Sequence, residues 1–136
     1  MTIKGSCLCG EVKFEIEGSL HNVSHCYCSM CCKSHGAAFA TYAAMDPDKF
    51  KWVSGEELVK VYISSPEMGR CFCSKCGAPL GAVEDSKVTY ITMGTVDGDP
   101  GARPEANIFV ASKASWYEIT DTLPQHDEYP PDNSIE

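Results

Sequence analysis

The cysteines of this chain fall into groups, and the grouping constrains the fold more than any other feature. Seven of the nine cysteines lie in three short motifs, Cys7-Leu8-Cys9, Cys26-Tyr27-Cys28-Ser29-Met30-Cys31 and Cys73-Ser74-Lys75-Cys76. Thiolates at such spacings are common zinc ligands in proteins. An odd number of cysteines also does not suit a fully paired disulfide framework. The pattern therefore predicts a small zinc-binding fold.

Two of the motifs together supply the four ligands of a closed tetrahedral zinc site. Cys7 and Cys9 precede a predicted strand, and Cys73 and Cys76 form a knuckle that ends at Gly77. A zinc ion shared by these pairs would join segments more than sixty residues apart. The alternative is that the four cysteines are buried thiols that pack as small hydrophobic side chains.

The remaining motif supplies three ligands, Cys26, Cys28 and Cys31, from a single short loop. Three protein ligands and one open position are typical of catalytic zinc. An open three-cysteine site would also release its metal readily. We therefore predict two zinc ions per chain, one structural and one catalytic and labile.

Three residues are candidates for a fourth ligand of the three-cysteine site, and two cysteines lie outside the motifs. His25, Cys32 and His35 are candidates for a fourth ligand, which would make the site closed and structural. His25 and Cys32 are neighbours of ligands in the sequence, so we expect packing or surface roles instead. Cys32 and Cys71 have no spacing that requires a metal. A redox sensor that uses these two as resolving thiols is a further hypothesis.

Composition narrows the possible partners. The 136 residues carry 19 acidic and 11 basic side chains, a net charge of −8, with no basic run. Binding to nucleic acid phosphates requires clustered Lys and Arg, so we expect no nucleic-acid partner. No apolar run is long enough to span a membrane, and the first residues lack a secretory signal. We expect a single cytoplasmic domain.

Alternating and turn-rich segments predict a mainly β structure. From Gly10 to Gly18, apolar residues alternate with charged ones, as in a half-buried antiparallel strand. Further strands are expected over 58–63 (with Trp52 and Val53 as its hairpin partner), around Cys71 to Cys73, and over 87–93, 108–111 and 116–119. Helical structure is expected only as short turns within 30–40 and 46–50, with Asp46 as a cap. Residues from Pro124 onward are expected to be a surface tail.

The cysteine motifs and their surroundings resemble a known family. Besides the cysteine motifs, the chain carries Gly36-Ala37-Ala38-Phe39, Arg70 before Cys71, Gly94-Thr95-Val96-Asp97, Ile108-Phe109-Val110 and Trp116. These residues resemble the glutathione-dependent formaldehyde-activating enzyme family, which also contains centromere protein V. The resemblance implies an Mss4-like β fold with two zinc ions, one domain over 1–124 and a C-terminal tail over 125–136.

The resemblance also implies roles for the cysteines. Cys7, Cys9, Cys73 and Cys76 would hold a structural zinc. The triplet Cys26, Cys28 and Cys31 would hold the catalytic one. The implied activity is that of a carbon–sulfur lyase that joins glutathione and formaldehyde as S-(hydroxymethyl)glutathione. Arg70 and Arg103 are the candidates to bind the carboxylates of glutathione, and Asn107 stands where many relatives have histidine.

Two classes of function follow. In the first, the open zinc position activates a small thiol that adds to an aldehyde, with His25 or His35 as candidate acid or base. In the second, the chain is a zinc-stabilised binding module without catalysis. The fourth ligand of the triplet distinguishes them, because a protein side chain there would close the site.

Overall fold

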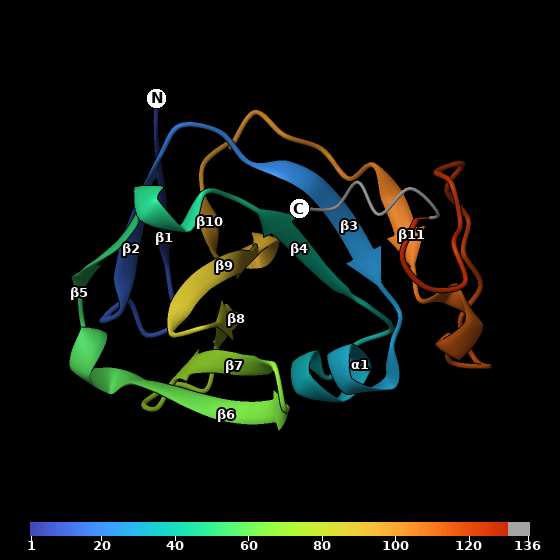
Figure 1. Cartoon of the computed structure of the whole chain (residues 1–136), viewed down its shortest axis with the longest axis horizontal. Coiled ribbons are helices and arrows are strands. Elements are labelled where there is room, and N and C mark those ends of the chain that lie inside the picture. Colours follow the sequence, from blue (N-terminus) through green and yellow to red (C-terminus); the bar gives the residue numbers. More distant parts are fainter. Residues whose placement is uncertain (131–136) are drawn as a thin grey trace.

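Two sheets form most of the protein, whose computed structural model describes residues 1–130, and all but one of their strand pairs are antiparallel (Figure 1). The smaller sheet has the order β10-β1-β2-β5, and the larger has the order β11-β3-β4-β9-β8-β7-β6. Their strands are β1 (Thr2–Ser6), β2 (Lys13–Glu17), β3 (His21–Cys26), β4 (Ala40–Ala44), β5 (Phe50–Ser54), β6 (Val59–Ser65), β7 (Met68–Cys73), β8 (Pro79–Glu84), β9 (Lys87–Thr92), β10 (Val96–Asp97) and β11 (Ala106–Ile108). The prediction of a mainly β fold is confirmed.

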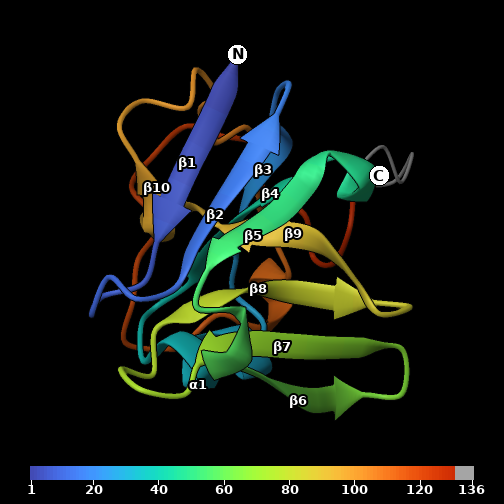
Figure 2. The ribbon, with the colours of Figure 1, turned by 90° about the vertical axis from the view of Figure 1, so that its left-hand side faces the viewer.

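The four-stranded sheet follows from the alternating pattern in the first part of the chain. In β2, Phe14 and Ile16 are buried while Lys13 and Glu17 are exposed. These two apolar side chains, with Ile3 of β1, pack against Val23 and Ile91 from the larger sheet. The main core therefore lies between the two sheets, which Figure 2 shows with the smaller sheet in front.

Helical structure is confined to short segments. Helix α1 (Ser29–His35) starts at Cys28, whose sulfur accepts a hydrogen bond from the Cys31 amide at 3.2 Å. It ends at Gly36, which adopts a left-handed conformation (φ 61°) that residues with a Cβ disfavour. The predicted turn after Asp46 is confirmed as the 3₁₀ helix η1 (Pro47–Lys49), where the Asp46 carboxylate accepts from the Asp48 amide at 2.9 Å. The other 3₁₀ helices are η2 (Glu56–Leu58), η3 (Met93–Thr95) and η4 (Val110–Ser112).

The predicted hairpin between Trp52 and the strand after it is wrong. Strand β5 pairs with β2 in the smaller sheet, whereas β6 pairs with β7 in the larger sheet. The chain crosses between the sheets at Gly55, where an added Cβ would lie 2.2 Å from the Glu11 carbonyl oxygen. After Gly55 the chain therefore continues into the larger sheet and does not form a hairpin with β5.

The strands predicted near the C-terminus need correction. Strand β11 ends at Ile108, because Phe109 adopts a left-handed conformation (φ 57°) and the 3₁₀ helix η4 follows. No strand forms over 116–119; the Tyr117 amide instead donates to the Ala114 carbonyl in a turn, and Trp116 is 73% exposed. The pairing of β11 with β3 is also parallel, unlike the other strand pairs of the two sheets.

The start of the predicted C-terminal tail is held on the surface by backbone hydrogen bonds. The Asn107 amide donates to the Pro124 carbonyl, and the His126 amide donates to the Asn107 carbonyl. Further bonds join residues 126–128 to residues 109–111. The rest of the predicted tail, residues 131–136, lies outside the described residues. No helix formed by residues 1–130 has the length and apolar character needed to cross a membrane.

Candidate metal centres

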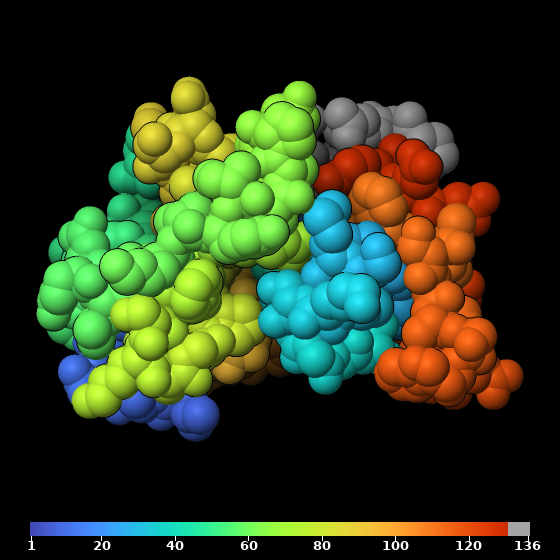
Figure 3. Space-filling view, turned by 90° about the horizontal axis from the view of Figure 1, so that it is seen from below, coloured from blue at the N-terminus to red at the C-terminus, as the bar shows by residue number. Residues whose placement is uncertain are grey.

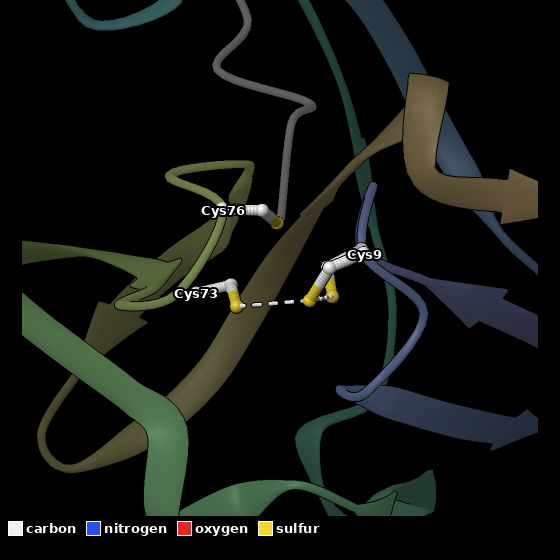
Figure 4. Close-up of side chains that lie close together, drawn as sticks. Cys9, Cys73 and Cys76 are labelled. Carbon is white, nitrogen blue, oxygen red and sulfur yellow. Dashed lines mark hydrogen bonds between the residues drawn. The ribbon is translucent and has the colours of Figure 1, made fainter.

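Four cysteines from the two sheets meet at one point. Cys7 follows β1, Cys9 lies two residues later, Cys73 ends β7, and Cys76 lies in the turn before β8. Their sulfur atoms all lie within 4.8 Å of one another. Figure 4 shows the sulfurs of Cys9, Cys73 and Cys76 turned toward one another from the two strand ends. The prediction that segments over sixty residues apart meet here agrees with this arrangement.

The spacing of these sulfurs suits a tetrahedral zinc ion. Zinc–sulfur bonds of about 2.3 Å at tetrahedral angles place neighbouring sulfurs about 3.8 Å apart. The Cys7 and Cys9 sulfurs are 3.5 Å apart, and the Cys9 and Cys73 sulfurs are 3.9 Å apart. Cys7 and Cys73 are buried in a core cluster with Val12 and Leu80. Four soft donors at this spacing form a site that zinc can fill without large movements.

Backbone amides stabilise negative charge at this cluster. The Ala78 and Cys9 amides donate to Cys76 and lower the pKa of its thiol to about 6. The Val12 amide donates to the Cys7 sulfur at 3.3 Å. Such amide–sulfur bonds favour thiolates, which are the form that binds metal.

The second cluster, here called the triplet, consists of Cys26, Cys28 and Cys31. Cys26 ends β3, Cys28 caps α1, and Cys31 lies in the first turn of that helix. The three sulfurs lie within 4.8 Å of one another, with those of Cys26 and Cys31 3.2 Å apart. The strand end and the helix start thus bring three donors together from six residues.

A cavity of about 310 Å³ opens beside the triplet and is lined by all three cysteines. Arg70 of β7 reaches into it, with Nη1 and Nη2 at 3.8 and 3.7 Å from the Cys31 sulfur. Arg70 Nη1 also donates to the Tyr42 hydroxyl at 3.0 Å, and Nε donates to the Ser64 hydroxyl at 3.2 Å. These contacts fix the guanidinium group against the thiols.

The surroundings favour a thiolate in the triplet. Hydrogen bonds with Cys26 and Cys31 lower the pKa of the Cys28 thiol, and the Arg70 charge lowers it further. Hydrogen bonds with Cys28 and Cys31 raise the pKa of Cys26, and its burial adds to this effect. One negative charge is therefore accommodated easily next to Arg70.

The three candidates for a fourth ligand point elsewhere. His25 Nδ1 bonds to the Thr41 hydroxyl at 2.8 Å, and its ring packs against Phe39 with the two planes inclined at 54°. His35 Nε2 bonds to the Tyr42 hydroxyl at 3.0 Å. The Cys32 sulfur donates to the Ala38 carbonyl at 3.1 Å. Within residues 1–130, no histidine, cysteine or carboxylate ligand atom joins the three sulfurs at the 4.8 Å separation.

Burial shapes the protonation of both histidines. It lowers the pKa of His25, an effect that the charge of Asp121 partly offsets. Burial also lowers the pKa of His35, and the nearby Arg70 lowers it further. Both rings are therefore held in the neutral form.

The other residues singled out in the sequence occupy different places. Arg103 pairs with Asp99 at 2.9 Å on the surface, and it does not line the triplet cavity. Asn107 is fully buried, and its Nδ2 donates to the Asp121 carboxylate at 3.0 Å. Cys71 is 1% exposed and belongs to the core cluster beside Cys73. Of the two arginine candidates, only Arg70 lies at the cavity.

Several cavity residues were missed from the sequence. Tyr42, Glu67, Glu84 and Tyr129 all line the triplet cavity but lie in four separate segments. Tyr129 packs its ring against Phe109, with centroids 5.0 Å apart. None of them belongs to a cysteine motif, so no local pattern marks them. The unusual φ of Phe109 is likewise invisible in the sequence.

Comparisons with known proteins agree with this architecture. A Halomonas elongata protein, provisionally named a glutathione-dependent formaldehyde-activating enzyme, is 29% identical over 130 residues, covering 88% of this chain and 82% of its own length. A crystal structure of a Rhodobacter sphaeroides protein matches with a TM-score of 0.55 and 26% identity, covering 71% of this chain and 89% of that one. The sequence profile of the glutathione-dependent formaldehyde-activating enzymes matches residues 2–112. Because this match covers most of the chain, the protein belongs to the glutathione-dependent formaldehyde-activating enzyme family.

Proposed function

We propose that the protein is a zinc-dependent carbon–sulfur lyase of the cytoplasm that adds glutathione to formaldehyde at the triplet. The observation that carries this proposal is the position of the triplet, which lines a cavity beside Arg70 and, within residues 1–130, presents three protein donors. The four-cysteine cluster instead joins two sheets and has a complete donor set. We assign it a structural zinc and assign the triplet the catalytic one.

The reaction joins the sulfur of a thiolate to the carbonyl carbon of formaldehyde. The carbonyl π electrons move to oxygen, which then takes a proton and gives a hydroxymethyl thioether. A zinc ion held by Cys26, Cys28 and Cys31 would supply a Lewis acid that lowers the pKa of the substrate thiol.

The residues of the chain contribute charge and proton transfer. The Arg70 guanidinium lies against Cys31 and would offset the net negative charge of three thiolates around a zinc ion. Tyr42 connects Arg70 to His35, so its hydroxyl is held at the cavity edge by two hydrogen bonds. Burial raises the pKa of Tyr42, and its phenol therefore stays protonated at neutral pH. It is positioned as a donor toward a developing oxyanion.

The test is the rate of exchange between glutathione, formaldehyde and their adduct, measured by NMR with zinc-loaded protein. Cys28→Ser removes one donor but retains a side-chain oxygen that can cap α1, so the variant is expected to fold. Cys32→Ser is the matched control, because Cys32 is adjacent to the triplet but bonds to a backbone carbonyl.

We expect the wild-type protein and Cys32→Ser to accelerate exchange above the spontaneous rate. The rate with Cys28→Ser, after the spontaneous rate is subtracted, should be at least about tenfold lower. Thiols and formaldehyde combine without a catalyst, so the rate in buffer alone must be subtracted. Equal rates for buffer, wild type and Cys28→Ser would refute the proposal. The remaining assignment would then be a zinc-stabilised binding module.

A further inference from the structure

A second cavity, of about 430 Å³, adjoins the triplet cavity and differs from it in charge. It lies between α1 on one side and β6, β7 and β8 on the other, and it shares Met30, Tyr42 and Arg70 with the triplet cavity. In Figure 3 this face shows α1 in cyan opposite the green segments of β6 and β7. We call this space the basic cavity, because Lys33 and Arg70 line it and none of its described lining residues is acidic.

The absence of acidic residues there is unusual for this protein. The whole chain carries a net charge of −8, with 19 acidic side chains. Among residues 1–130, four basic side chains form ion pairs, and Lys33 and Arg70 are not among them. Arg70 faces the Cys31 sulfur, whereas Lys33 pairs with no acidic side chain of residues 1–130, so the charge of Lys33 gives the cavity a local positive potential that favours an anionic ligand.

The groups around Arg70 leave room for such a ligand. Arg70 uses Nε for Ser64 and Nη1 for Tyr42, and both Nη atoms face Cys31. A guanidinium group has five N–H donors, so one N–H of Nη2 stays available. The hydroxyls of Ser34 and Ser64 also line the basic cavity. This combination of cations and hydroxyls suits a carboxylate.

The triplet cavity has the opposite character. Glu67 and Glu84 line it together with the three cysteines. A carboxylate placed there would face like charges, whereas the basic cavity offers opposite charges a short distance away. Arg70 lies on the boundary and belongs to both spaces.

From this division of charge we propose that the basic cavity binds a carboxylate of the thiol substrate, so that Lys33 makes the site selective for acidic thiols over neutral ones. The inference rests on the proposed function and assigns the orientation of its substrate. The sulfur lies at the triplet, and the chain of the thiol passes Arg70 so that its anionic end reaches Lys33.

The test compares Lys33→Gln with Lys60→Gln, which removes an exposed lysine on β6 that does not line the cavity. Each zinc-loaded protein is assayed with glutathione, 3-mercaptopropionate and 2-mercaptoethanol as thiols for formaldehyde. We expect Lys33→Gln to raise KM for the two acidic thiols about threefold to fivefold and to leave 2-mercaptoethanol unchanged. Raising the salt concentration should weaken the binding of acidic thiols, seen as a higher KM, more in the wild type than in Lys33→Gln.

A binding measurement separates this inference from the proposed function. S-methylglutathione cannot form the adduct, and its affinity is measured by NMR titration of the same zinc-loaded proteins. Loss of affinity in Lys33→Gln alone, with no thiol accelerated by any protein, would uphold the carboxylate site and refute the proposed reaction. Acceleration with equal effects of Lys33→Gln and Lys60→Gln on acidic and neutral thiols would overturn the carboxylate site and leave the reaction standing. No binding and no acceleration would refute both.

Discussion

Replacing Cys73 by alanine tests whether the four-cysteine cluster holds the two sheets together through a metal. Structural zinc contributes about 10–16 kcal/mol of apparent binding free energy, whereas a domain of this size is stable by only about 5–15 kcal/mol. If the four cysteines contribute equally to the zinc-binding free energy, the loss of one ligand costs about 3 kcal/mol of stability. For a chain of this length that loss lowers the unfolding temperature by about 10 °C or more.

Cys71→Ala is the matched control for this change. Cys71 lies two residues earlier on β7, is 1% exposed against 0% for Cys73, and belongs to the same core cluster. Its sulfur is not part of either cysteine group. Its replacement should cost about 1 kcal/mol, the typical loss for a small change in a core.

The measurement is thermal unfolding followed by circular dichroism, with zinc content determined for each protein. We expect Cys73→Ala to bind its zinc more weakly through the three remaining cysteines and to unfold well below Cys71→Ala. Treatment of the wild-type protein with a strong chelator should remove the cooperative transition. If the two alanine variants unfold at the same temperature, the four cysteines act as ordinary buried side chains and the structural zinc is refuted.

Two further predictions concern packing and pH. Gly81→Ala places a Cβ 2.3 Å from the Tyr90 carbonyl oxygen and should cost about 1–3 kcal/mol, whereas Gly94→Ala meets no atom within 4 Å and should be neutral in the same urea titration. The lowered pKa of His35 means that, as pH falls below about 6.5, the unfolded chain binds a proton that the folded chain does not. Wild-type stability should therefore fall below that pH, and His35→Gln should lose less when both are measured at one zinc concentration; parallel curves would contradict this.

The cysteine groups were visible in the sequence because metal ligands obey local spacing. The pairs at Cys7 and Cys73 and the triplet from Cys26 to Cys31 each place donors within a few residues, so a strand end or a helix start suffices to bring them together. The alternation through Phe14 and Ile16 was readable for a similar reason, because one face of β2 is buried.

Strands buried on both sides were harder to recognise. Strand β4 contains Ala40, Ala43 and Ala44 at buried positions and carries no alternation. Strand β5 was recognised, but its partner β2 was not. This pairing goes with the packing of Gly55 against the Glu11 backbone, a contact between residues far apart in the sequence. The end of β11 depends on the conformation of Phe109, which no local pattern specifies.

By itself the sequence determined the family, the mainly β class and the division of seven cysteines into a group of four and a group of three, since these depend on short-range spacing and composition. Only the tertiary structure decided what surrounds the triplet. Arg70 reaches Cys31 from a strand 39 residues away, and Tyr42 and Lys33 join it from β4 and α1. Charges that far apart along the chain act on one another only after folding brings them within a few ångströms.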